Sequence, residues 1–148
     1  MSKGNTSPLV AVYALIGKDV RLLLIEDRAR NADVLPGGVV RAGEPIEHAL
    51  RRSLHDQLGV TVAQADFCAV IEHGTADAAH DPESELAFVF DVTLSDVDQL
   101  QLVAADPRPF RWAGEHDLEP LRPEAIRDRL RAGKLLADAQ WAWWPWKS

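Results

Sequence analysis

Residues 35–60 have the sequence LPGGVVRAGEPIEHALRRSLHDQLGV, which runs from a Pro-Gly-Gly turn through a short extended piece into one amphipathic helix. The predicted helix begins at Glu44-Pro45, since proline tolerates the first helical position and glutamate suits the positive end of the helix dipole. Gly59 is placed to end it, because glycine readily adopts the left-handed conformation of a C-terminal cap. We expect the rest of the chain to form a scaffold around this stretch.

One side of the predicted helix is apolar. At about 100° per residue, a single row is formed by Ile46, Leu50, Leu54 and Leu58. On the adjoining strip, Ser53, Asp56 and Gln57 have the i, i+3, i+4 spacing that makes side chains neighbours. Such a helix can pack its apolar row on a sheet and leave small polar groups along the floor of a cleft.

The spacing of charged residues and glycines in this stretch resembles the Nudix box. That pattern is Gly, five residues, Glu, seven residues, then Arg-Glu-aliphatic-any-Glu-Glu-any-Gly-aliphatic. The positions of this chain that match it are Gly38, Glu44, Arg52, Leu54, Gly59 and Val60. The resemblance implies an α/β fold, the Nudix-type α/β/α sandwich with a mixed sheet between two helices. It also implies pyrophosphatase chemistry, in which water attacks a pyrophosphate.

The box of this chain is degenerate at its metal-binding positions. The three glutamates that hold magnesium in working family members fall here on Ser53, Asp56 and Gln57. Magnesium prefers oxygen ligands and is normally held by carboxylates together with substrate phosphates. Asp56 is the one carboxylate left, and its side chain is one methylene shorter than glutamate. The resemblance therefore implies Mg²⁺ (or Mn²⁺) as cofactor, with Asp56 as its ligand and with weak binding.

The resemblance also implies roles for other residues. Arg52 would position its neighbours, while Ser53 and Gln57 would coordinate weakly or through water. Family members can supply a further carboxylate from the part of the chain that holds Glu72, Glu83 and Glu85. The residues predicted to be catalytic are Arg52, Ser53, Gln57 and Glu85. The residues predicted to bind substrate are Gly37, Gly38 and Glu44.

Two functions from different classes follow from the resemblance. The first is a Nudix hydrolase that cleaves nucleoside-diphosphate-linked compounds by metal-assisted water attack, weakly because two of three ligand glutamates are missing. The second is a non-catalytic Nudix domain that binds a nucleotide-like ligand or a protein partner in the same cleft. For either, the expected small-molecule partner is a phosphate ester.

Composition narrows the class of protein. The chain has 148 residues, 47% hydrophobic and 26% charged, which is ordinary for one globular domain. The formal net charge of −7 argues against partners such as nucleic acid polymers or anionic membranes, whose sequence-independent binding needs an excess of Lys and Arg. Residues 1–8 lack the apolar segment of a signal peptide, and Cys68 is the single cysteine. These features predict a cytoplasmic protein.

Apolar patterns outside the box predict the remaining elements. Strands are expected at residues 8–16, 20–25, 61–73, 85–94 and 110–112. The first two should form a hairpin around residues 17–19, and the next two a longer hairpin around the polar residues 74–84. A second helix should begin at Pro123 and end at Gly133.

The C-terminal segment, residues 135–148, is rich in tryptophan. Four of the five tryptophans of the chain are Trp141, Trp143, Trp144 and Trp146. Indole side chains are large and are enriched at interfaces. We therefore predict one Nudix domain over residues 1–148, with its box at 38–60 and its tail packed on the domain or in a homodimer contact.

Overall fold

The computed structural model describes residues 9–75, 83–96, 100 and 109–132. The helices are α1 (Ile46–Leu58) and α2 (Glu124–Arg131), with a 3-10 helix η3 (Glu115–Asp117). The strands are β1 (Leu9–Leu15), β2 (Gly17–Lys18), β3 (Arg21–Asp27), β4 (Ala32–Val34), β5 (Gly37–Val39), β6 (Val62–Thr75), β7 (Glu83–Leu94), β8 (Phe110–Ala113) and β9 (Leu121–Arg122). The tryptophan-rich tail lies outside the described residues.

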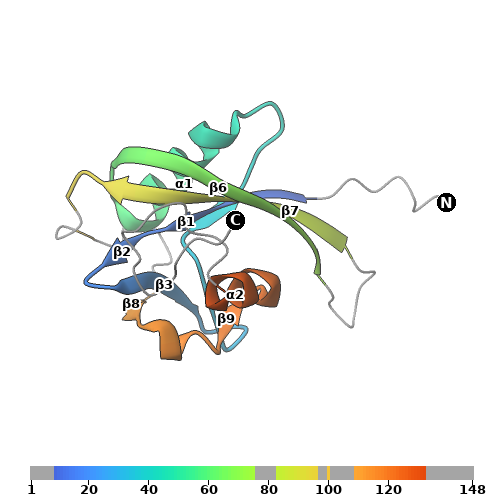
Figure 1. Ribbon diagram of the computed structural model, residues 1–148. Coiled ribbons are helices and arrows are strands. Elements are labelled where there is room, and N and C mark those ends of the chain that lie inside the picture. The colour runs from blue at the N-terminus through green and yellow to red at the C-terminus, as the bar shows by residue number, and fades with distance from the viewer. Residues whose placement is uncertain (1–8, 76–82, 97–99, 101–108, 133–148) are drawn as a thin grey trace.

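The strands form two curved sheets. The first has the order β5-β1-β7-β6, and the second has the order β2-β3-β4-β9, with β8 also paired to β3. The first sheet is mixed, because β1 and β7 are parallel whereas β5 and β6 are antiparallel to their neighbours. Figure 1 shows α1 on one side of this sheet and α2 on the other. The predicted sandwich and the long β6–β7 hairpin are thus confirmed.

The predicted hairpin of residues 8–16 with 20–25 is wrong. Strand β1 pairs with β5 along one edge and with β7 along the other, so it has no free edge for β3. The chain bends instead after Ile16, whose carbonyl accepts a hydrogen bond from Leu23 N at 2.9 Å. A short β2–β3 hairpin follows, in which Lys18 faces Arg21.

The turn of this hairpin holds two residues in left-handed backbone conformation, Asp19 at φ 54° and Val20 at φ 63°. A two-residue turn of this kind favours Asn-Gly, because a β-branched side chain is strained at positive φ. We expect Val20→Gly to raise the free energy of unfolding by about 0.5–1 kcal/mol, the relief of left-handed strain less the entropy cost of glycine. Urea denaturation measures this.

The control for the turn variant is Val70→Gly. Val70 is about as exposed as Val20 but lies in the regular part of β6. Glycine in a strand interior costs roughly 0.5–1 kcal/mol, so this variant should be less stable than the natural protein. A Val20→Gly protein that is destabilised as much as the control would show that the turn is not strained.

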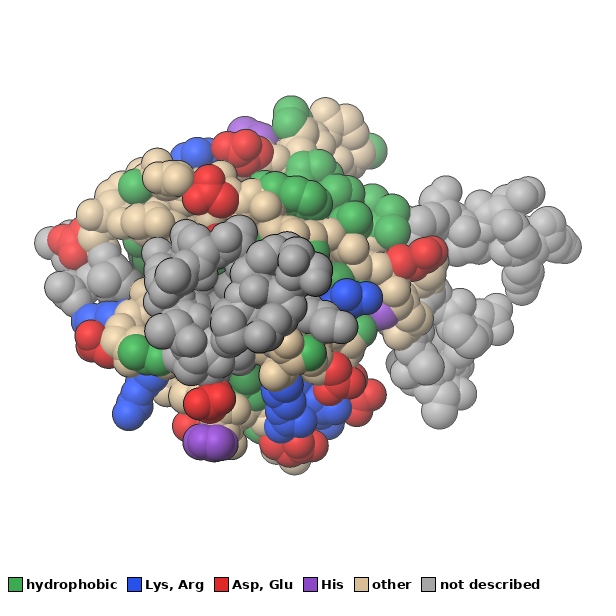
Figure 2. All heavy atoms as spheres, viewed as in Figure 1, with side chains coloured by type: hydrophobic (Ala, Val, Ile, Leu, Met, Phe, Trp, Pro, Cys, Tyr) green, Lys and Arg blue, Asp and Glu red, His purple; other side chains and the backbone are tan. Residues whose placement is uncertain are grey.

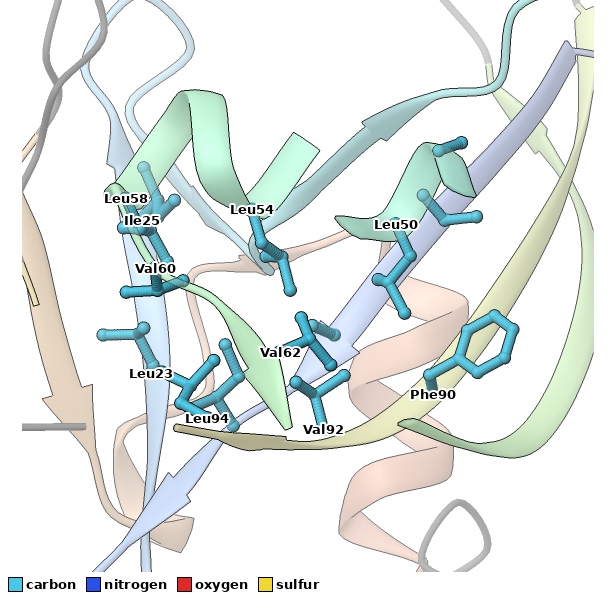
Figure 3. Close-up of a cluster of buried hydrophobic side chains, with 14 residues drawn as sticks. Leu23, Ile25, Leu50, Leu54, Leu58, Val60, Val62, Phe90, Val92 and Leu94 are labelled. Carbon is cyan, nitrogen blue, oxygen red and sulfur yellow. The ribbon is translucent and has the colours of Figure 1, made fainter. Parts of the chain in front are cut away.

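Helix α1 packs its apolar row against both sheets. Leu50, Leu54 and Leu58 are fully buried and point toward the strands, as Figure 3 shows. Each such burial contributes about 1.5–3 kcal/mol. The helix ends at Gly59, which has φ 69° and donates its N–H to His55 O at 2.9 Å. The sequence-based helix and its cap are confirmed.

Alternate residues of β1 face the two helices. Val12 and Ala14 belong to the hydrophobic cluster with α1, whereas Leu15 is buried in the cluster that holds Ile126 and Leu130 of α2. Tyr13 packs against this second cluster. The sheet therefore separates an α1 side from an α2 side, and the position of any site can be stated relative to them.

The surface carries charges of both signs. Figure 2 shows acidic and basic side chains interspersed over the lower part of the molecule, where α2 and η3 lie. There Glu119 accepts from Arg131 at 2.8 Å and lies near Arg127. Within the described ranges, no helix has the length and apolar character needed to cross a membrane.

Candidate active site

The first contact of the site joins α1 to strand β5. On either side of β5, Pro36 O accepts a hydrogen bond from Ala14 N, and Val40 N donates to Val10 O of β1. Gly37 N–H points the other way, toward α1, and donates to Gln57 Oε1 at 3.0 Å. Gln57, which the resemblance implies to be a weak metal ligand, therefore holds the backbone of β5 at Gly37.

Two glycines allow β5 to pack closely against its neighbours on both sides. Gly37 has φ 151°, and a Cβ there would lie only 2.0 Å from Val12 O. A Cβ on Gly38 would lie 2.9 Å from Ser53 Oγ. Ser53 itself is 6% exposed. Gly37 therefore allows β5 to lie close to β1, and Gly38 allows it to lie close to α1.

The second contact is an ion pair between Glu44 and Arg52. Arg52 Nε donates to Glu44 Oε2 at 2.8 Å, and Arg52 Nη2 donates to Glu44 Oε1 at 2.9 Å and to Val39 O at 3.1 Å. Glu44 Oε1 also accepts from Arg41 N at 3.0 Å. The pair connects the helix, the preceding loop and β5, which is the geometry that a buttressing role requires.

The hydrogen-bond donors around Glu44 stabilise its ionised form. Hydrogen bonds from the Arg52 side chain and then from the Arg41 backbone lower the pKa of Glu44 from 4.5 to about 2. Because the pKa is depressed in the folded state, the stabilisation is fully present above pH 4.5 and is lost as the pH falls toward 2. We expect Glu44→Gln to be less stable than the natural protein at neutral pH. The difference in free energy of unfolding between the two proteins should shrink as the pH falls from 4.5 to about 2.

Urea denaturation across the same pH range tests the Glu44 prediction. The matched control is Glu47→Gln, because Glu47 lies on α1 with an exposed side chain that contacts Arg51 at 3.4 Å. Its effect should be small at every pH, as for surface ion pairs in general. A constant difference between Glu44→Gln and the natural protein from neutral pH to pH 2 would contradict the assignment.

The donor set of the box does not fit the divalent metal that the resemblance implies. Asp56 has a side chain that is 63% exposed, with Oδ1 at 3.6 Å from His55 Nδ1. Ser53 is buried against Gly38, and the oxygen of Gln57 is used by Gly37 N–H. Within the part of the chain that the structure describes, no group of three or more His, Cys, Asp or Glu residues could hold a metal. Magnesium normally requires such converging oxygens.

Glu85, the predicted carboxylate from outside the box, belongs to a separate cluster. It is 8% exposed, and its Oε1 accepts from His73 Nε2 at 2.7 Å. Tyr13 Oη donates to its two oxygens at 3.1 and 3.2 Å. Burial, and then the charge of Glu85, raise the pKa of Tyr13. Because these residues face the α2 side, Glu85 and Ser53 lie on opposite faces of the first sheet.

Two partners in this cluster, Tyr13 and His73, were not singled out by sequence reasoning. A signal for His73 was present, because it directly opposes Glu85 at the ends of the predicted hairpin. Tyr13 gave no such signal, since it reaches Glu85 along the sheet past the small residues Ala11 and Ala87. Glu72 is exposed, and the side chain of Glu83 lies outside what the structure describes.

A surface cavity of about 340 Å³ lies away from the box. It is lined by Glu26, Asp27, Arg28, Asn31, Ala32, Asp33, Arg111 and Pro120. Arg111 pairs with the buried Asp33 and also donates to Asp117 O at 3.0 Å. The cavity has charges of both signs, and we assign it no part in the box chemistry.

Comparisons with known proteins agree with this fold. A family model described as NUDIX domain matches residues 6–136. The structure is similar to that of a MutT NUDIX hydrolase from Burkholderia pseudomallei, with 30% identity, a TM-score of 0.68, and coverage of 82% of this chain and 95% of the other.

More distant structures share the fold alone. A MutT protein from Methanosarcina mazei Go1 has 22% identity and a TM-score of 0.66, with 84% of this chain and 91% of that one covered. A UDP-X diphosphatase has 18% identity and a TM-score of 0.66, with 83% of this chain and 59% of that one covered. Comparison with curated proteins gives no match.

Proposed function

This chain belongs to the Nudix family, and from that premise we propose that it slowly hydrolyses the pyrophosphate bond of nucleoside-diphosphate-linked compounds. The proposal rests on one observation. The loop before α1 and the Glu44–Arg52 ion pair that supports it are present, whereas the three positions that would bind metal are Ser53, Asp56 and Gln57. Changes around a metal ligand alone typically cost about 10–100-fold in activity or metal affinity. Loss of two ligand carboxylates should cost more.

Individual residues would contribute through position rather than through a metal. Arg52 and Glu44 hold β5 in place, so that the Gly37-Gly38 turn keeps a fixed backbone beside α1. Glu85, the carboxylate predicted from outside the box, is held by Tyr13 and His73 on the α2 side of the first sheet, so we assign it no role at the α1–β5 edge. We do not propose that Asp56 alone holds Mg²⁺ or Mn²⁺ tightly.

A second candidate function is supported by the same contacts. If Gln57 and Ser53 serve only to hold β5, the domain would bind a nucleotide-like ligand or a protein partner without hydrolysis. The orientation of Gln57 toward Gly37 favours this alternative, because it removes one of the oxygens that metal binding would use. Packing of residues 135–148 on the domain or in a homodimer contact is part of either proposal.

The deciding experiment measures turnover and binding together. A panel of nucleoside-diphosphate sugars and related compounds is incubated with Mg²⁺, with Mn²⁺ or with EDTA, and phosphorus NMR follows bond cleavage. The MutT NUDIX hydrolase from Burkholderia pseudomallei serves as the comparison protein in the same assay. We expect kcat/KM to be lower for this chain by about 100-fold or more.

Each outcome separates the two candidates. Equal rates for the two proteins would show that the missing glutamates have been replaced from elsewhere in the chain. Ligand binding without cleavage would favour the non-catalytic domain. Failure of the whole panel to bind or react would overturn hydrolysis and nucleotide binding, and would leave binding of a protein partner.

A further inference from the structure

We propose that Gln57 contacts the phosphate oxygens of a ligand directly, as a hydrogen-bond donor, so that this chain binds pyrophosphate compounds without a divalent metal. The inference rests on the proposed function only in taking the α1–β5 edge as the ligand site. It reverses the role that the family resemblance implies for this position, from metal ligand to donor.

The orientation of the Gln57 amide follows from its partner. Gly37 N–H can only donate, so the atom of Gln57 that lies 3.0 Å away must be the oxygen. The amide nitrogen then points away from Gly37 and carries two N–H groups. Among the hydrogen bonds of the described residues, none is made by Gln57 Nε2. Since Gln57 is only half-buried, these donors are available to a ligand.

A glutamate in the same place would behave in the opposite way. One carboxylate oxygen could accept from Gly37 N–H, and the other would remain an anionic acceptor, which suits a cation. Glutamine presents a neutral donor group instead, which suits the oxygens of phosphate. The sequence difference at this position therefore changes the kind of group that the site can bind.

The charge of the surrounding strip points the same way. Ser53 and Gln57 are uncharged, and the charge of Glu44 is offset by Arg52 in their ion pair. Asp56 is the remaining carboxylate on this strip, and its exposed side chain points into solvent beside His55. Three glutamates would repel a phosphate in the absence of metal, whereas this strip repels it much less.

The test is calorimetric titration of ADP and of inorganic pyrophosphate, each in EDTA and in magnesium. We expect the natural protein to bind with a similar Kd in both conditions. Gln57→Glu should bind about 10- to 100-fold more weakly in EDTA, because a donor becomes a like charge, and should regain affinity with magnesium. Gln57→Met should lose affinity in both conditions, because it offers neither donor nor carboxylate.

The matched control is Gln64→Glu, which makes the same charge change on β6, where Gln64 is exposed and bonds to Asp66 at 2.9 Å. It should bind as the natural protein does. The proposal is overturned if the natural protein binds neither probe in EDTA, or if Gln57→Glu binds as well as the natural protein there. Because no step of this test requires turnover, a failure of hydrolysis leaves its result unchanged.

Discussion

Gly37→Ala is expected to destabilise the protein by about 2–4 kcal/mol, the range for a large side-chain clash combined with backbone strain. The Cβ of alanine would lie 2.0 Å from Val12 O, and the φ of 151° is one that L side chains rarely adopt. Both atoms in the clash belong to paired strands, so no side chain can move aside. Strand β5 would have to separate from β1.

The measurement is urea denaturation, with Gly74→Ala as the control. A Cβ at Gly74 would have no heavy atom within 4 Å, so this variant should unfold near the natural midpoint. Separation of β5 would also break the hydrogen bond from Gly37 to Gln57, so ligand binding in EDTA should weaken together with stability. If Gly37→Ala unfolds within about 0.5 kcal/mol of the control, the close packing of β5 is wrong.

The elements that sequence predicted well are those with a local signal. Helix α1 has an apolar row at helical spacing and a glycine where the helix ends, and both features were found. The β6–β7 pairing follows from two alternating strands joined by one polar connection. The error at β1 and β3 arose because apolar periodicity identifies a strand but not the partners at its two edges.

Features of the site that depend on tertiary contacts could not be predicted. The need for glycine at position 37 depends on where the Val12 carbonyl lies, and that is set by β1–β5 register. The orientation of Gln57 depends on which backbone group of β5 faces the helix. The residue types at positions 53, 56 and 57 can be read from the chain, but only the packing of α1 and β5 shows that Ser53 is buried and Asp56 exposed.

The burial of Ser53 and the exposure of Asp56 determine how a metal site could be restored. Restoring it is the second large effect that we expect. The design leaves Ser53 unchanged, because its side chain is buried beside Gly38. Glutamate can be accommodated at positions 56 and 57. Asp56 is exposed, and a carboxylate at 57 can still accept from Gly37 N–H with one oxygen while the other faces outward.

We expect the double variant Asp56→Glu, Gln57→Glu to gain much more stability from magnesium than the natural protein does. Two carboxylates give a divalent ion oxygen ligands that one exposed aspartate does not provide. At a magnesium concentration about 100 times its Kd, the linked stabilisation would be about 2.7 kcal/mol.

Thermal melting in EDTA and in magnesium measures the gain, and Gln64→Glu controls for weak binding at surface carboxylates beside Asp66. In EDTA the double variant should be slightly less stable, because adjacent carboxylates repel. A natural protein that gains as much from magnesium as the double variant would mean that its own residues already hold the metal, and Gln57 would then have no reason to act as a donor.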